Sequence, residues 1–185
     1  MNLKTDEVDT PEKRAAHKIG VVGCGQLGLA YAVAFADAGF KVTCADADQS
    51  AVKGVVKGKV RLGDRDAEAK LKRLVRTEQI VATTDLKQAV AESDVVVLAV
   101  NPKVNAKKTL SYTEAEGVYK QVGTTLQTGS LVVYSGVAAF GLTGGLLRET
   151  LENMSGLRAG KDFGLAYNAA QNVGHLEDQE LLVAV

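Results

Sequence analysis

The clearest chemical signature in this 185-residue sequence is a glycine loop that reads Gly23-Cys24-Gly25-Gln26-Leu27-Gly28. The loop follows a short β-branched run and opens a segment rich in alanine and leucine, as a strand-to-helix turn does. Such a turn directs backbone N–H groups and the positive end of the helix toward a pyrophosphate. Gly23 permits the tight turn, Gly25 lets the backbone approach the phosphates, and Gly28 lets the helix pack against the strand. The loop predicts a dinucleotide site, and the alternative is a glycine turn that holds no ligand.

An acidic residue, Asp46, stands at the end of the second predicted strand. A carboxylate at this point accepts hydrogen bonds from the ribose hydroxyls of the adenosine half and repels a 2′-phosphate. The loop and the carboxylate together predict NAD as the cofactor in preference to NADP.

The remaining reactive side chains indicate no metal centre and no catalytic group. Cys24 and Cys44 are expected near the carboxyl ends of adjacent strands, where a reducing compartment disfavours a disulfide. His17 borders a charged segment and His175 lies in a polar stretch, so both are interpreted as solvated. The basic residues between Lys70 and Arg76 are interpreted as a solvated helix face, with phosphate binding as the alternative.

Alternating apolar strands and amphipathic helices must position these residues. Strands separated by single helices require right-handed crossovers and a parallel sheet. The predicted fold class is therefore α/β: a Rossmann-like, doubly wound, mainly parallel six-stranded sheet with helices on both faces. The predicted strands are Ile19–Val22, Lys41–Ala45, Ile80–Thr83, Asp94–Val100, Ser130–Tyr134 and Phe163–Tyr167. The predicted helices are Gln26–Ala38, Asp48–Val56, Ala67–Val75, Leu86–Ala91, Ser111 to about Leu126, and Leu142–Glu152.

Two local predictions concern the segment after the fourth strand. The segment from Asn101 to Leu110 is polar and contains Pro102, so it is predicted to be a loop. Ser111 is followed three residues later by Glu114, which predicts a capping box at the start of the next helix.

Charge and hydropathy exclude several classes of partner. The chain has 22 basic and 22 acidic side chains, and this balance argues against a nucleic-acid partner. The longest apolar run, Val95 to Val100, is too short to span a bilayer. No apolar secretory segment follows Met1. These features predict a cytoplasmic protein that contacts neither membrane nor nucleic acid.

The chain is predicted to divide at residue 17. Residues 1–17 hold seven charged residues against two large aliphatic ones, too few to offset the entropy of ordering, so a charged tail is predicted. A short helix capped by Thr10, with Pro11 at its first position, is the alternative. Residues 18–185 are predicted to form one Rossmann domain. The last residues, Leu181 to Val185, are apolar and are expected to pack against a partner surface, which a homo-oligomer would supply.

From Lys18 to about Asn168 the sequence resembles the N-terminal NAD-binding domain of the UDP-glucose/GDP-mannose dehydrogenase family. The resemblance is carried, in the family's order, by KIGVVGCGQLGLAYAVAFADAGFKVTCADAD, ATTD, SDVVVLAVN, LSY, GSLVVYSGV and SGLRAGKDFGLAYN. Full-length members of the family oxidise the C6 alcohol of a nucleotide sugar to a carboxylate in two NAD-dependent steps. They do so through a thioester on a cysteine that lies beyond this domain, in company with a C-terminal sugar-nucleotide domain.

The resemblance also implies a role for individual residues. The loop residues that would wrap the pyrophosphate are Gly23, Gly25, Gln26, Leu27 and Gly28. Asp46 would take the adenosine ribose, Val100 and Asn101 would pass near the adenosine-side edge of the cofactor, and Ser135 would approach the nicotinamide half.

The sequence departs from the family where the chemistry should be. The family's Ser-Thr-Val-Pro stretch reads Ser135-Gly136-Val137-Ala138 here, so the threonine hydroxyl is missing. The Pro-Glu that follows the family's sixth strand is Ala169-Ala170, and neither cysteine matches the nucleophile. Groups without a titratable proton or a hydroxyl cannot transfer a proton or orient water. No catalytic residue is therefore assigned.

Three functions remain open from the sequence. The first is the NAD domain of a nucleotide-sugar dehydrogenase, which would meet a sugar substrate only with a further C-terminal domain. The second is a stand-alone, degenerate NAD-binding module that acts as a sensor or assembly partner. The third is a dehydrogenase of another Rossmann family, for which no Lys/Asn or Tyr/Lys catalytic pair is evident.

Overall fold

The structure is a computed structural model that describes residues 4–59, 65–104 and 108–168. Its centre is a six-stranded sheet in the order β3-β2-β1-β4-β7-β8, in which every pairing is parallel. The strands are β1 (Lys18–Val22), β2 (Lys41–Ala45), β3 (Ile80–Thr83), β4 (Val95–Leu98), β7 (Leu131–Ser135) and β8 (Gly164–Asn168). The predicted α/β fold class and all six predicted strands are confirmed.

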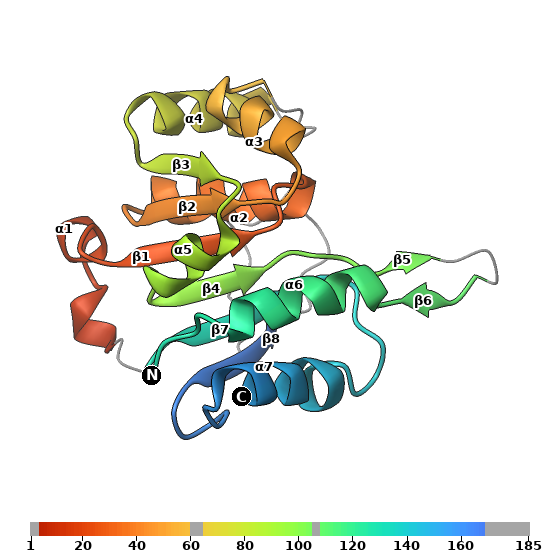
Figure 1. Cartoon of the computed structure of the whole chain (residues 1–185). Helices are drawn as coiled ribbons and strands as arrows, with labels where there is room; N and C mark the ends of the chain where they lie inside the picture. Colours follow the sequence, from red (N-terminus) through yellow and green to blue (C-terminus); the bar gives the residue numbers. More distant parts are fainter. Residues whose placement is uncertain (1–3, 60–64, 105–107, 169–185) are drawn as a thin grey trace.

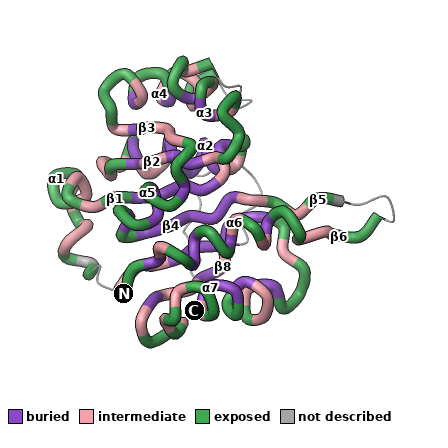
Figure 2. Tube along the Cα trace, in the orientation of Figure 1, coloured by how far each residue is buried: buried purple, intermediate pink, exposed green. Residues whose placement is uncertain are grey.

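Helices cover both faces of this sheet (Figure 1). One face packs against α2 (Gln26–Asp37), α3 (Gln49–Val56) and α4 (Arg65–Arg76). The other packs against α5 (Leu86–Ala91), α6 (Thr113–Gly123) and α7 (Arg148–Ser155), which follows a π-helical turn, η2 (Thr143–Leu147). Figure 2 shows the buried residues concentrated in the strands and on the inward sides of the helices. Strands buried on both faces are typical of parallel sheets.

The order of the strands determines where a ligand can bind. The chain builds outward from β1 through β2 to β3, then returns to the other side of β1 with β4, β7 and β8. The direction of winding therefore reverses between β1 and β4. In open α/β sheets, ligands bind outside the carboxyl ends of the strands at this point of reversal. The glycine loop follows β1, and Asn101 follows β4, so both lie at this edge.

The segment after β4 differs from its prediction. The structure has a small antiparallel pair, β5 (Lys103–Val104) and β6 (Leu110–Ser111), where a loop was expected. Strands of two residues carry no alternating pattern that a sequence could reveal. The capping box is also wrong: Tyr112 occupies the N-cap position of α6 without a side-chain cap, and Glu114 instead pairs with Lys103 at 2.8 Å.

The charged N-terminal segment contains the helix that was its alternative interpretation. After a short 3₁₀ turn, η1 (Thr5–Glu7), α1 (Pro11–Arg14) begins at Thr10, whose hydroxyl accepts from the Lys13 N–H. The Arg14 guanidinium donates to the backbone oxygens of Val8 and Ala38 at 2.6 and 3.1 Å. The hydrogen bond to Ala38 ties the segment to the end of α2.

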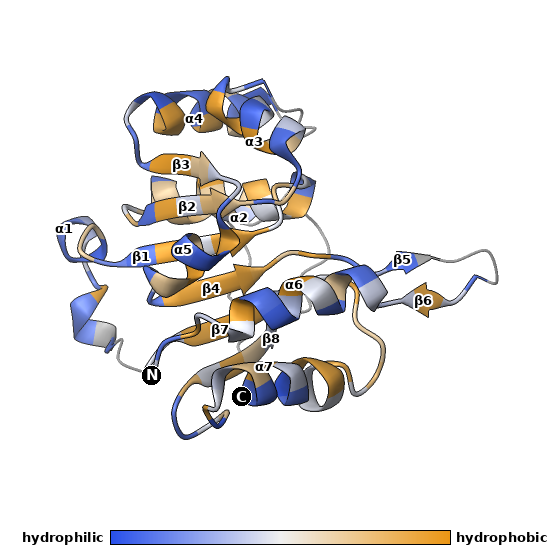
Figure 3. Cartoon of the chain, viewed as in Figure 1, coloured by the Kyte–Doolittle hydropathy of each residue, from blue (hydrophilic) through white to orange (hydrophobic). Residues whose placement is uncertain are grey.

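Hydropathy follows burial along the described chain. Figure 3 shows hydrophobic residues along the strands and hydrophilic ones on the outer surface of α4. None of the helices within the described ranges has the length and apolar character that crossing a membrane requires.

Candidate functional site

The glycine loop closes tightly onto the strands behind it. Gly23 has φ +103°, a backbone conformation that favours glycine, and its N–H donates to the Ala45 oxygen at 2.8 Å. A Cβ at Gly23 would lie 2.8 Å from the Ala99 oxygen, and a Cβ at Gly28 would overlap the Gly23 oxygen. Because these neighbours are backbone atoms, neither position can accept a side chain unless the backbone moves. The first and third glycines therefore act as the loop motif predicts.

The middle glycine has the opposite surroundings. No atom lies within 4 Å of the position that a Cβ on Gly25 would take, and both Gly25 and Gln26 are exposed. Gly25 is the N-cap of α2 and provides no side-chain cap. The first N–H groups of a helix lack intrahelical acceptors and carry partial positive charge. An anionic group such as a pyrophosphate fits this open approach, while Leu27 turns inward and packs against the core.

Asp46 joins the glycine loop to the strand beside it. One carboxylate oxygen accepts from the Cys24 N–H at 2.7 Å, and the other accepts from the Asp48 N–H at 2.9 Å. A carboxylate has about four acceptor positions, so two backbone bonds leave capacity for ribose hydroxyls. The side chain is partly exposed, as a ligand contact requires. Asp48 caps α3 as predicted, and its hydrogen bonds with Ser50 lower the pKa of its carboxyl.

Val100 and Asn101 lie where β4 leads into the edge of the sheet. Val100 is half-buried, and its side chain approaches the Gly23 Cβ position to 3.4 Å. Asn101 is exposed, and its Oδ1 accepts from the Val137 N–H at 3.0 Å. The Asn101 side chain therefore reaches past β4 to the loop that follows β7.

Ser135 is part of a buried polar network. Its side chain is fully buried at the end of β7, and its hydroxyl donates to the Tyr31 hydroxyl at 2.7 Å. Asn168, the register partner of Ser135 on β8, donates to the same oxygen at 2.9 Å. Sequence reasoning missed Tyr31 and Asn168, since Tyr31 shares the spacing of the apolar face of α2. The network ties α2 to the carboxyl ends of β7 and β8.

We expect Tyr31→Phe to lower the free energy of unfolding by about 1–3 kcal/mol, because two buried polar side chains lose this shared partner. Chemical denaturation measures the difference. Tyr112→Phe is the matched control, since the Tyr112 hydroxyl accepts a single N–H, that of Ala139, at a partly exposed site. A Tyr31→Phe loss no larger than that of the control would show that the network adds nothing to stability.

The two cysteines lie together, as expected, near the ends of β1 and β2. Both are free and buried. The hydrogen bond with Cys24, followed by burial, raises the pKa of the Cys44 thiol. A thiol that resists ionisation is a poor nucleophile, so Cys44 is unsuited to covalent catalysis.

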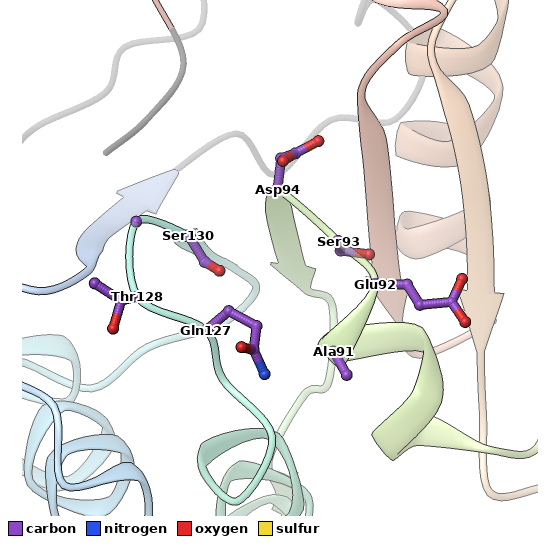
Figure 4. Close-up of a pocket in the computed structure, with 8 residues that line it drawn as sticks. Ala91, Glu92, Ser93, Asp94, Gln127, Thr128 and Ser130 are labelled. Atoms are coloured by element: carbon purple, nitrogen blue, oxygen red, sulfur yellow. The ribbon is translucent and has the colours of Figure 1, made fainter.

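The other residues noted from the sequence lie away from this edge or outside the described residues. His17 sits 3.3 Å from Asp94 at the amino end of the sheet, and Lys70 and Arg73 both pair with Asp37 of α2. Figure 4 shows a polar pocket lined by residues 91–94 and 127–130, just before β4 and β7. That pocket is at the opposite end of the sheet from the glycine loop. His175 and Ala169-Ala170 fall outside the described residues.

Comparison with known proteins shows the family to which the chain belongs. Residues 17–171 match the family described as the UDP-glucose/GDP-mannose dehydrogenase family, NAD binding domain. UDP-glucose 6-dehydrogenase of Rhizobium meliloti is 32% identical over 140 residues, which cover 72% of this chain and 31% of the relative. GDP-mannose 6-dehydrogenase of Pseudomonas aeruginosa is 28% identical over 156 residues, which cover 82% of this chain and 35% of the relative. The chain thus spans about a third of the length of the curated relatives it matches.

Solved structures give the same result. An NDP-N-acetyl-D-galactosaminuronic acid dehydrogenase from Methanosarcina mazei superimposes with a TM-score of 0.78 at 27% identity, covering 90% of this chain and 37% of that one. A ternary complex of GDP-mannose dehydrogenase from Pseudomonas aeruginosa superimposes with a TM-score of 0.76 at 26% identity, covering 81% and 35%. The chain belongs to the UDP-glucose/GDP-mannose dehydrogenase family, and residues 17–171 are its NAD-binding domain.

Proposed function

We propose that the chain holds NAD(H) across the carboxyl edge of the sheet, with the pyrophosphate over the loop from Gly23 to Gly28. In this arrangement Gly25, Gln26 and Leu27 offer backbone N–H groups to the phosphates. Asp46 accepts hydrogen bonds from the hydroxyls of the adenosine ribose, and Val100 lies beside the glycine loop at Gly23. The observation that carries this proposal is the contrast within the loop: Gly23 and Gly28 face backbone at close contact, whereas Gly25 faces open space.

We further propose that the described residues supply the cofactor half of a nucleotide-sugar oxidation and not its reacting half. The relatives named above are dehydrogenases of UDP-glucose and GDP-mannose, and this chain spans about a third of their length. Gly136 offers no hydroxyl, and a side chain at this position would have to displace the Asn101 carboxamide, since even a Cβ would lie 2.6 Å from Asn101 Oδ1. Oxidation of a sugar nucleotide would therefore need groups outside the described residues.

The alternative is a stand-alone NAD-binding module, a sensor or assembly partner. The observation that favours it is the position of the Asn101 carboxamide, which lies beside Gly136 and binds the Val137 N–H where the family has a threonine side chain. The reading frame after Val185 discriminates between the two. A continuing frame that encodes a cysteine-containing, family-like segment would favour the enzyme, and a native stop codon would favour the module.

We expect the chain to bind NADH more tightly than NADPH by about tenfold, equivalent to about 1.4 kcal/mol, because the 2′-phosphate would face the Asp46 carboxylate. Calorimetric titration with both nucleotides measures the ratio. Asp46→Asn is expected to weaken NADH binding and to reduce the preference. Asp162→Asn is the matched control, because its carboxylate also accepts a backbone N–H, at 2.8 Å from Arg158, but lies just before β8 at the far end of the sheet. Equal affinities of the unmodified chain for NADH and NADPH would refute the role of Asp46.

A further inference from the structure

The Asn101 side chain connects the end of β4 to the loop after β7. In the strand order, both lie on the other side of β1 from Asp46, which follows β2. The Asn101 Oδ1 accepts from Val137, and the space beside it exists because residue 136 is a glycine. The loop it holds is fixed from three other directions. The Tyr134 hydroxyl donates to the Val137 oxygen at 2.9 Å, the Tyr167 hydroxyl donates to the Gly136 oxygen at 3.4 Å, and the Ala139 N–H donates to the Tyr112 hydroxyl at 2.9 Å.

The same tyrosine connects the loop to the start of the Asn101 segment. The Tyr134 hydroxyl also lies 3.4 Å from the Val100 oxygen. Burial raises the pKa of Tyr134, so this hydroxyl keeps its proton and remains a donor. Tyr134 therefore connects the backbone just before Asn101 to the loop after β7, and the hydrogen bond from the Val137 N–H gives the Asn101 carboxamide a defined orientation. With Oδ1 turned to Val137, the two Nδ2 hydrogens are the donors that this exposed side chain presents.

The strand order decides which half of a dinucleotide these donors can meet. Asp46 follows β2, the glycine loop follows β1, and Asn101 follows β4 and reaches toward β7. Adjacent strands are about 4.8 Å apart, so β2 and β4 are separated by about 10 Å. A ribose bound at Asp46 cannot also reach the far side of β4. A cofactor with adenosine at β2 and pyrophosphate at β1 must extend its other half over β4 and β7.

Ser135 does not offer a donor at this place. The sequence predicts it near the nicotinamide half, but its hydroxyl is fully buried and donates to Tyr31. Among the residues at the ends of β4 and β7 that the structure describes, Asn101 combines an exposed position with a fixed amide.

We propose that Asn101 is a positioning residue for the nicotinamide riboside half of NAD(H), with its Nδ2 donating to that half while its Oδ1 is locked against Gly136 and Val137. The proposal rests on the function proposed above and adds a subsite to it. The glycine at position 136 then has a role beyond the loss of the family's threonine hydroxyl: it leaves room for the Asn101 carboxamide, which any side chain at 136 would push away. The two positions form one unit.

The test compares NADH with ADP, which keeps the adenosine and both phosphates but has no nicotinamide riboside. Calorimetry gives the ratio of the two affinities for each variant. We expect Asn101→Ala and Gly136→Ala each to lower this ratio about tenfold, and the double variant to lower it no further, as residues that act through one contact do. Gly117→Ala is the matched control for Gly136→Ala, since a Cβ at this glycine of α6 meets no atom within 4 Å.

Asn101→Asp separates positioning of the cofactor from simple pinning of the loop. The aspartate keeps an acceptor for the Val137 N–H but has no Nδ2 donor. ADP carries more negative charge than NADH, so repulsion by the aspartate would raise the ratio of affinities, and a fall in the ratio reports the lost donor. We expect the ratio to fall as it does in Asn101→Ala. A ratio equal to that of the unmodified chain would show that Asn101 only pins the loop, and equal losses for NADH and ADP in Asn101→Ala would place it at the adenosine half. Either result would overturn the proposal, whereas failure of the unmodified chain to bind NADH would overturn the proposed function itself.

Discussion

Replacing Gly25 by valine is expected to reduce NADH affinity by about 100-fold or more, equivalent to about 2.7 kcal/mol, while the fold survives. A branched side chain at Gly25 would stand in the open space over the first turn of α2, where the pyrophosphate must approach. The substitution is compatible with folding because Gly25 has φ −71° and ψ 179°, an extended conformation that valine adopts readily. Calorimetry measures the affinity, and circular dichroism confirms the fold.

Two other glycine substitutions show whether the loss is specific. Gly117→Val introduces the same side chain into open space on α6 and should leave NADH binding unchanged. Gly28→Ala should instead destabilise the protein, by about 3 kcal/mol, because its Cβ would overlap the Gly23 oxygen and the helix would have to move off the strand. If Gly25→Val binds NADH as tightly as the unmodified chain, the glycine loop holds no pyrophosphate.

Most of the fold could be predicted from the sequence because its signals are strong and local. Strands β1 to β4 are short β-branched runs, and a parallel sheet buries such runs on both faces. The end of α2 and the cap of α3 follow from Gly39 and Asp48, whose roles depend only on nearby backbone. The β5–β6 pair could not be predicted, since two residues per strand are too few to show a period.

The candidate site likewise has one part that the sequence predicts and another that only the packing of the fold brings together. The glycine loop and Asp46 belong to one strand-helix-strand unit, so their spacing in the sequence reports their proximity. The contacts of Asn101 and Ser135 join residues far apart in the chain: Asn101 with Val137, and Ser135 with Tyr31. No spacing rule connects such pairs, because their distance depends on how β4, β7 and α2 pack. The loss of a threonine at Gly136 was visible in the sequence, but the side chain that fills its space was not.

The second large effect concerns catalysis, and we expect the 185-residue chain to produce no NADH from UDP-glucose, UDP-N-acetylsugars or GDP-mannose at saturating NAD. Cys44 is buried with a raised pKa, and neither cysteine matches the family's nucleophile. Gly136 has no hydroxyl, and a side chain at this position would have to displace the Asn101 carboxamide. General acid–base groups commonly contribute about 10²- to 10⁴-fold each, and the covalent step is lost in addition. The rate should therefore be at least about 10⁴-fold below that of a full-length relative assayed alongside.

The assay follows the absorbance of reduced nicotinamide over hours with each sugar nucleotide. A preparation that is folded and binds NADH in the same buffer is required, because inactivity of an unfolded sample would say nothing about the site. Gly25→Val supplies the background, since it should retain the fold but not the cofactor. Steady NADH formation that disappears in Gly25→Val would show that the described residues do contain a reacting group. Asn101 and Lys103 would then be the first to replace, because both follow β4 at the carboxyl edge and Lys103 carries an exposed ammonium group paired with Glu114.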